Sequence, residues 1–348
     1  MASSTKTVLT SPRRLEKSNV HWRRPAIIGV VTGLIATVCI ATGHNAYALP
    51  LVTGAWFTSL LDTHELIGLH LRKMCGTVLW LSAGATIGGL ASTTGYWQLF
   101  IVAVVAFICG FAGAFGNFGL GAGSLALAMY ALFAGMPISE RTALESGALT
   151  LLGGAISIMV TLVFHFVGTR SPLRMHAAAS DPRLATLKGH LRPSDPYVRH
   201  AVRLSLLMVI ATAIAHSMSW PHEYWIPMTV AWVARPGRLL TLERTWNRIL
   251  GTLAGIVFIT CLMFVTGNPP YELAFLIAAG VTLHLALVRA NYAIAVSGLT
   301  VTIMALFAID GQTVEMNAPY RIVATLIAGL LLSIGTLLWP VAEEPGAK

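Results

Sequence analysis

The sequence has few charged residues for its length. Only 11% of its 348 residues are charged, whereas a soluble domain carries about 25%. Its mean hydropathy is +0.72. A chain of this composition cannot cover a globular surface with charged side chains, so it is not a soluble enzyme or a soluble nucleic-acid-binding protein.

The sequence also lacks the side-chain groupings that metal sites and catalytic centres need. Its four cysteines (Cys39, Cys75, Cys109 and Cys261) lie in or beside apolar runs, and none has metal-ligand spacing to another. Isolated thiols in such surroundings behave as small hydrophobic side chains. We therefore expect no metal, no cofactor and no enzymatic activity.

Acidic residues are absent from the middle of every apolar run. The acids nearest to the runs fall at their ends, namely Asp62, Glu65, Glu145 and Glu272. Ionisable groups in the middle of a membrane segment commonly mark proton pathways. The sequence therefore shows no carboxylate relay for protons.

The sequence is rich in apolar runs, most of them long enough for a bilayer-spanning helix of about 17–25 residues. Twelve spans are predicted, near residues 26–42, 46–61, 75–91, 97–115, 118–134, 146–167, 202–219, 223–234, 248–266, 272–288, 292–308 and 321–339. The predicted fold class is all-α, a polytopic integral membrane protein with about 12 transmembrane helices.

The predicted organisation has two membrane units and one polar connector. A cytoplasmic basic tail covers 1–25, a first six-helix repeat 26–168, a cytoplasmic connector 169–200, a second six-helix repeat 201–340 and a tail 341–348. With the N-terminus inside, 21 of the 23 Lys and Arg residues lie on the cytoplasmic side, and only Arg141 and Arg321 lie outside. Both termini are therefore expected in the cytoplasm, and the net charge of +9 reflects topology rather than nucleic-acid binding.

The two six-helix units resemble each other at a nearly constant offset. A shift of 175 residues places Gly76-Thr77 on Gly251-Thr252 and Lys73 on Arg248. A shift of 174 places Asn117-Phe118 on Asn291-Tyr292, and a shift of 177 places Tyr47 and Pro50 on Tyr224 and Pro227. Since six helices return the chain to the same side, the repeats are predicted to be parallel, related by an axis along the membrane normal.

One stretch of the second unit, residues 224–255, carries a family resemblance. It contains Tyr224-Trp225-Ile226-Pro227, Arg235-Pro236, Arg238, Glu243-Arg244, Arg248, Gly251-Thr252 and Gly255. This pattern resembles the signature of the fusaric-acid-resistance-like family, which includes bacterial aromatic-acid exporters and is related to plant aluminium-activated malate transporters. The resemblance implies export of small organic, chiefly aromatic, acids or related toxic compounds across the bacterial inner membrane, with a periplasmic adaptor protein as partner.

The residues themselves point to a substrate site in the same stretch. The spans 223–234 and 46–61 are short, and each contains a proline, Pro227 or Pro50, which is expected to disturb the helix. Short or proline-interrupted spans at matching positions of two repeats indicate a substrate site. Arg244 and Arg248, four residues apart on the next helix, could hold a carboxylate bidentately. The alternative is that both arginines anchor the helix at the lipid headgroups.

Several further residues are candidates with a plain structural alternative. Tyr224 and Trp225 could stack on an aromatic substrate or serve as interfacial anchors. Lys73 would replace Arg248 in the first repeat. Asn117 and Asn291 are predicted helix N-caps that could also flank an entrance. His284, well inside a span, is either linked to proton movement or a packed interior histidine.

Taken together, the sequence predicts a multi-pass transporter that exports small organic anions. A passive organic-anion channel is the first alternative, because no acidic relay is visible, and a membrane partner subunit without flux of its own is the second. The expected partners are the lipid bilayer and a small organic anion, and a homo-oligomer is compatible with the sequence.

Overall fold

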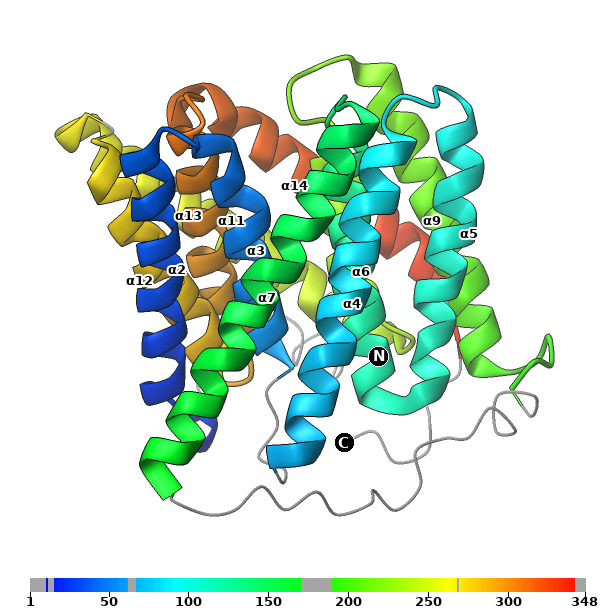
Figure 1. Cartoon of the computed structure of the whole chain (residues 1–348). Coiled ribbons are helices and arrows are strands. Elements are labelled where there is room, and N and C mark those ends of the chain that lie inside the picture. The colour runs from blue at the N-terminus through cyan, green and yellow to red at the C-terminus, as the bar shows by residue number, and fades with distance from the viewer. Residues whose placement is uncertain (1–10, 12–15, 62–66, 170–189, 268, 342–348) are drawn as a thin grey trace.

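The computed structural model describes residues 11, 16–61, 67–169, 190–267 and 269–341, and these form helices with no strand among them. The first group is α2 (Arg23–Thr42), α3 (Ala48–Leu60), α4 (Ile67–Ala91), α5 (Trp97–Phe111), α6 (Gly116–Ala134) and α7 (Glu140–Thr169). The second group is α9 (Pro196–Met218), α10 (Trp225–Val233), α11 (Arg238–Thr266), α12 (Pro270–Leu287), α13 (Tyr292–Ile309) and α14 (Val314–Leu338). Figure 1 shows them as one bundle of upright helices.

The predicted all-helical, multi-pass membrane fold is confirmed. In the part of the chain that the structure describes, nine helical segments are long and apolar enough to cross a bilayer, with α5 and α6 counted together as Trp97–Ala134. Each predicted span overlaps one of the helices above, but α3 and α10 have only 13 and nine residues. At 1.5 Å per residue these two are about 20 Å and 14 Å long, shorter than the hydrocarbon core of about 30 Å. The count of twelve full spans stays a prediction.

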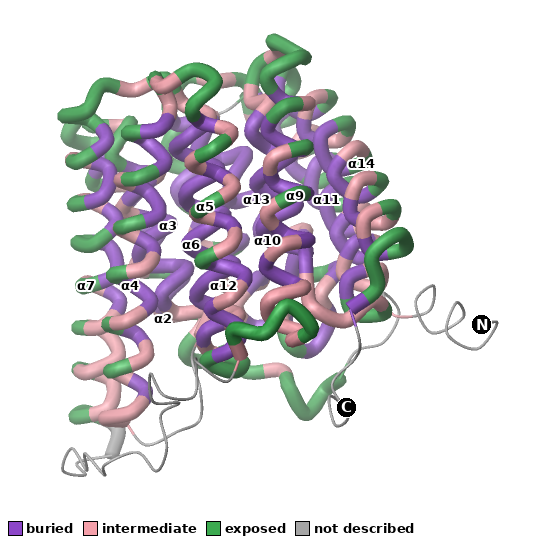
Figure 2. Tube along the Cα trace, turned by 90° about the vertical axis from the view of Figure 1, so that its right-hand side faces the viewer, coloured by how far each residue is buried: buried purple, intermediate pink, exposed green. Residues whose placement is uncertain are grey.

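The two short helices form the centre of the bundle. All nine residues of α10 are buried, and α3 is buried over most of its length. Figure 2 shows both mainly in purple, whereas the outer sides of the surrounding helices are green. The helices that cover them expose apolar side chains such as Leu34, Phe100 and Phe275, which suits a lipid-facing surface.

The prediction that the prolines disturb these short helices is wrong. Pro50 and Pro227 are each the third residue of their helix. The first four N–H groups of a helix have no intrahelical acceptor, so a proline there removes no hydrogen bond. The proline that does lie within a helix is Pro319 in α14.

Two helix pairs connect the halves of the chain, and each pair takes one helix from either half. The first helix of each half lies against the fourth helix of the other, α2 against α12 and α9 against α5. Within the halves, α4 packs on α6 and α7 as α11 packs on α13 and α14. Small residues permit this close approach: a side chain at Gly84 would meet the backbone of Ala126, and one at Gly251 would meet that of Ala293. This arrangement is compatible with the predicted parallel repeat, which stays a prediction.

The described helix ends agree in direction with the predicted topology. The starts of α2 and α9 and the end of α7 lie at the lower end of the bundle in Figure 1. Residues 1–10 and 342–348, and positions 170–189 of the predicted connector, fall outside the described residues. The cytoplasmic location of both termini therefore stays a prediction.

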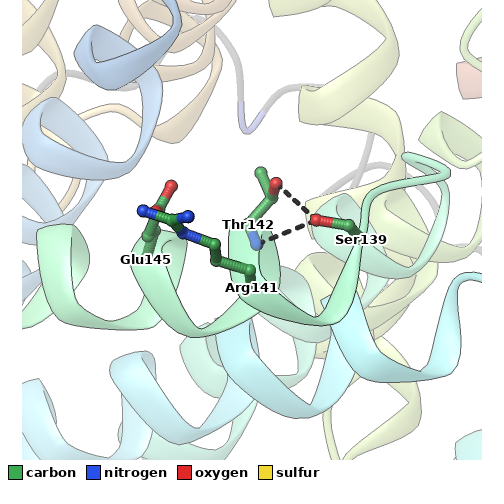
Figure 3. Close-up of polar contacts among 4 residues, drawn as sticks. All are labelled: Ser139, Arg141, Thr142 and Glu145. Atoms are coloured by element: carbon green, nitrogen blue, oxygen red, sulfur yellow. Dashed lines mark hydrogen bonds and ion pairs between the residues drawn. The ribbon is translucent and has the colours of Figure 1, made fainter.

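The opposite end of α7 shows how an exposed arginine is accommodated. Ser139 Oγ accepts a hydrogen bond from the Thr142 backbone N–H at 3.2 Å, which caps the helix (Figure 3). Arg141 pairs with Glu145 one turn later, with 3.0 Å between Nε and Oε1, and 90% of the Arg141 side chain is exposed. An exposed pair of this kind contributes little to stability.

A central aromatic and arginine site

One face of α10 carries two tryptophans and a threonine. Trp225, Thr229 and Trp232 follow each other at four and three residues, so they share one side of the helix. They are 0%, 1% and 8% exposed. The two indoles lie about 10 Å apart along the helix axis, at a rise of about 1.5 Å per residue.

Each tryptophan of this face is next to a fully buried arginine from another helix. The guanidinium carbon of Arg321, in α14, lies 5.1 Å from the centre of the Trp225 ring. That of Arg248, in α11, lies 5.9 Å from the centre of the Trp232 ring. Their side chains are 0% and 1% exposed. We call Trp225, Thr229, Trp232, Arg248 and Arg321 the central site.

The polar atoms of the central site are largely without partners. Among the described residues, Nε and both Nη atoms of Arg321, Nε and Nη1 of Arg248, and Thr229 Oγ1 have no hydrogen-bond acceptor or donor. No carboxylate in that part of the chain forms an ion pair with either arginine. Burying an unpaired charge is expensive, and contact with an indole offsets only a part of it. The arrangement suits a ligand that brings negative charge to both guanidinium groups.

Two other arginines, the buried Arg203 and the half-buried Arg235, provide the contrast. Arg203 in α9 donates from Nη2 to the carbonyl oxygens of Arg235 (2.6 Å) and Pro236 (3.0 Å), and from Nη1 to that of Trp339 (3.1 Å). Arg235 itself donates to Ser124 Oγ at 2.9 Å and to the Ala234 carbonyl at 2.7 Å. These two side chains fasten the end of α10 to α6, α9 and α14, and they leave little capacity for a ligand.

The predicted pair of Arg244 and Arg248 is divided between two environments. Both lie on α11, but Arg244 is only half-buried, and its guanidinium carbon sits 5.1 Å from the Tyr292 ring centre. Arg248 instead faces Trp232, and its positive charge acts on Arg321. A bidentate grip by Arg244 and Arg248 stays a prediction, and the structure adds Arg321 as the second fully buried guanidinium.

The sequence prediction began the last span at Arg321 and counted this residue on the outer side, and the predicted start of the helix is wrong. The span was expected to begin at residue 321, whereas α14 begins at Val314 and carries Arg321 two turns inside. The missed signal is a polar stripe, because Asn317, Arg321 and Thr325 recur every four residues and continue into the apolar run. All three are buried.

Tyr224 and Pro227 line a small cavity beside the Trp225 end of α10. Tyr224 is 5% exposed and its ring meets Trp225 edge-on at 6.3 Å. The cavity has a volume of about 180 Å³ and is also lined by Gln98, Tyr130 and Glu223. Burial raises the pKa of Glu223, against the influence of the nearby His216.

His284 belongs to the Trp232 end of the central site. It is 0% exposed, and its Nδ1 donates to the Ala295 carbonyl at 2.8 Å. That bond leaves Nε2, which has no partner among the described residues. The ring contacts Trp56 edge-on at 5.3 Å and Trp232 at 6.2 Å. Packing and ligand contact are both compatible with this position.

The remaining predicted residues fall outside the central site. Asn291 caps α13 as expected, since its side chain accepts from the Ile294 N–H at 3.0 Å. The same prediction for Asn117 is wrong, because Asn117 is exposed and is the second residue of α6. Lys73 is half-buried in α4, and Pro50 is buried in α3.

A larger cavity lies at the end of the bundle that is predicted to be cytoplasmic. Its volume is about 490 Å³, and its polar lining includes His21, Arg23, Arg24, His70 and Arg289. Apolar side chains from α2, α4, α7 and α12 form the rest of its wall. In the described part of the chain, no cluster of His, Cys, Asp or Glu could hold a metal ion.

Comparisons with known proteins bear on the second half of the chain. Residues 210–334 match the family described as fusaric acid resistance protein-like. This range contains α10 to α13 and most of α14, and with them every member of the central site. The resemblance inferred from the sequence is therefore confirmed.

Relatives with a curated sequence are all larger than the matched region. An uncharacterized Synechocystis protein, slr1298, is 32% identical over 41% of this chain and 19% of its own length. The inner membrane protein YccS of Escherichia coli is 31% identical over 44% of this chain and 21% of its own length. The uncharacterized protein YhfK of Escherichia coli is 30% identical over 49% and 25%. The matched part thus spans about a fifth to a quarter of these relatives, and no solved structure matches the chain.

Proposed function

We propose that this multi-pass membrane protein, which carries a fusaric acid resistance protein-like domain over residues 210–334, transports small organic anions through its central site. The observation that carries the proposal is the pair of fully buried guanidinium groups of Arg248 and Arg321, which form no ion pair with a carboxylate in the described chain. All three nitrogens of Arg321 lack a hydrogen-bond partner among the described residues, and Arg248 interacts with the side chain of Tyr292. A bacterial inner membrane, outward direction, aromatic substrates and a periplasmic adaptor are further parts of the proposal, and they rest on the family resemblance.

The chemistry of the central site fits a carboxylate attached to a planar ring. A guanidinium group offers parallel N–H donors that match the two oxygens of a carboxylate. An indole beside it offers a flat apolar face for the ring of the same molecule. Because Arg321 with Trp225 and Arg248 with Trp232 repeat this combination, one anion could be passed between two similar positions about 10 Å apart along α10.

The basic cavity at the predicted cytoplasmic end would supply the anion. Positive side chains around a cavity mouth raise the local concentration of anions. From there an anion would meet Arg248 before Arg321, because Trp232 is nearer than Trp225 to the end of α10 that precedes Arg235. Alternate opening of the two ends would make the protein a transporter.

A passive organic-anion channel is the second candidate. It is favoured by the lack of acidic residues around the central site, since no described Asp or Glu pairs with its arginines. Without a carboxylate that takes up and releases protons, coupling to a proton gradient has no visible carrier. A partner subunit without flux is the remaining outcome of the test.

The test is uptake of radiolabelled benzoate by liposomes that contain the purified full chain. Neutral benzoic acid crosses a bilayer unaided, so uptake by protein-free liposomes is subtracted. Accumulation above that level driven by a pH gradient indicates a transporter, and equal protein-dependent flux without a gradient indicates a channel. We expect a double variant, Arg248→Lys with Arg321→Lys, to weaken benzoate binding by more than the roughly 5- to 150-fold expected of one substitution, which is the equivalent of about 1–3 kcal/mol for a charge-assisted hydrogen bond. Arg141→Lys, at an exposed site, is the matched control and should behave as the parent. No benzoate flux in the parent, or full activity in the double variant, contradicts the proposal.

A further inference from the structure

The turn between α9 and α10 has an unusual backbone. Ser219 and His222 have positive φ angles of 48° and 59°, and they are the two non-glycine residues with this property in the described chain. Side chains other than glycine rarely adopt this conformation, and such residues cluster at ligand clamps and switch regions. The backbone of His222 is therefore held in an unfavourable conformation. Its side-chain contacts must offset the free-energy cost of that conformation.

The contacts of His222 all point toward the end of the central site. Its imidazole is stacked on Trp225, with 4.6 Å between ring centres and 20° between ring planes. It also lies 4.9 Å from the Phe307 ring of α13. Its Nδ1 is 2.8 Å from Tyr224 Oη, and the side chains of Gln312 and Asn317 interact with the same ring. One imidazole thus ties the start of α10 to the adjoining ends of α13 and α14.

His222 and Arg321 share a single indole. Trp225 has the guanidinium carbon of Arg321 at 5.1 Å and the His222 ring at 4.6 Å from its ring centre. Trp225 and Arg321 are both 0% exposed. The imidazole therefore holds the kind of stacking position that the planar part of a ligand of Arg321 would need.

The charge state of His222 suits this role. Burial lowers the pKa of His222, hydrogen bonds to Gln312 and Asn317 oppose the shift, and the positive charge of Arg321 lowers the pKa again. A neutral imidazole can remain stacked beside a buried guanidinium group, whereas an imidazolium would repel it.

We propose that His222 is the gate at this end of the pathway: its imidazole closes the central site by stacking on Trp225, and an anion passes when the turn at 219–223 carries the ring away. This inference rests on the proposed function for the identity of what passes. The stacking of His222 on Trp225 is seen in the structure and does not depend on which anion passes. The end in question is the one that the charge distribution predicts to be outside.

The gate can be tested by the accessibility of a buried position behind it. Thr229, 1% exposed and one turn beyond Trp225, is replaced by Cys in a chain whose four natural cysteines are removed. Spheroplasts that carry this protein are treated with a membrane-impermeant thiol reagent, and the labelling rate at residue 229 is measured. We expect His222→Ala to raise the rate about tenfold, which corresponds to the loss of about 1.4 kcal/mol, the upper range for an aromatic contact.

Three further variants make the test specific. His222→Phe keeps a ring on Trp225 and should label at the parental rate, whereas His222→Gln keeps a hydrogen-bonding group without a ring and should label fast. His216→Ala removes an exposed histidine at the same end of α9 and is the matched control. Thermal melting in detergent checks that each variant is folded, and His222→Gln replaces His222→Ala if the latter is not.

The outcomes separate the gate from the transport proposal. Equal labelling of the ring-free variants and His216→Ala, including no labelling in any of them, overturns the gate. Fast labelling of the ring-free variants together with no benzoate flux in any form of the protein supports the gate and contradicts the proposed function. Benzoate flux in the parent, together with an unchanged labelling rate at residue 229 in the ring-free variants, overturns the gate but leaves the proposed function standing.

Discussion

A buried arginine from a neighbouring helix lies against the inner face of α10, and another lies against the segment that follows its last residue, but the two have opposite hydrogen-bonding environments. Beyond the helix, Arg203 donates to three backbone carbonyls within 3.1 Å. On the inner face, Arg321 has no hydrogen-bond partner in the described chain and only an indole at 5.1 Å. Equal burial therefore does not imply equal roles. A satisfied guanidinium stabilises the fold, whereas an unsatisfied one reduces stability and is useful where a ligand can bind.

The largest expected effect is a difference in sign between two matching substitutions. Arg203→Met removes the donor for three carbonyls and should destabilise the protein by about 3–5 kcal/mol, as when one partner of a buried polar network is lost. Arg321→Met removes an unpaired buried charge and should leave stability unchanged or raised. Thermal melting in detergent micelles compares the two variants. A large loss of stability in Arg321→Met would show that this arginine is structural as well.

The next effect separates the two arginines of α11 by ligand affinity. Arg248→Lys keeps the charge but loses the planar fork, so benzoate binding should weaken by about 5- to 150-fold, equivalent to about 1–3 kcal/mol. Arg244→Lys should weaken it less, because Arg244 is half-buried over Tyr292 and does not contact Trp232. Arg238→Lys is the control. Equal losses of benzoate affinity in Arg244→Lys and Arg248→Lys would instead support the predicted bidentate grip of one carboxylate by Arg244 and Arg248.

A smaller effect is expected at His284, which has one satisfied nitrogen and one without a partner. Its Nδ1–H is used by the Ala295 carbonyl, and its buried Nε2 has no acceptor among the described residues for the N–H that a charged ring would carry. We therefore expect His284→Gln to leave the pH dependence of transport as it is in the parent. Benzoate flux between about pH 5.5 and 7.5, one unit either side of the usual histidine pKa of about 6.5, measures this. Loss of the pH dependence would assign proton movement to His284 instead.

The smallest effect concerns two asparagines at matching positions of the halves. Asn291→Ala removes the cap of α13 and should cost about 1 kcal/mol. Asn117→Ala should change stability by less than about 0.5 kcal/mol, since Asn117 is exposed inside α6. The melting temperatures of the two variants test this. A similar decrease in both would indicate that Asn117 has a partner in the folded protein after all.

The two halves also differ in how much they contribute to the central site. At the positions 175 residues before Arg248, His284 and Arg321, the first half has Lys73, Cys109 and Ser146. Buried guanidinium groups thus come from the second half alone at these positions. That half is also the one that matches the family, whereas α3 brings Trp56 against His284 from the first half.

The sequence by itself determined the helical, multi-pass character of the chain, the approximate positions of its helices and the family resemblance of the stretch around Trp225 and Arg248. These follow from local properties, because apolar run length, helical period and a continuous motif are all read along the chain. The same local reading misjudged Pro50 and Pro227, since the effect of a proline depends on the residue at which the helix begins.

Only the tertiary structure decided which charged side chains are buried without a partner. Arg203, Arg248 and Arg321 look alike in sequence, and Arg321 lies at the edge of an apolar run, as Arg141 does. The carbonyl partner of Arg203 and the indole beside Arg321 come from residues more than 30 positions away, Trp339 and Trp225. Hydrogen-bond satisfaction is a property of the packed bundle, so the central site became visible only when α10, α11 and α14 were brought together.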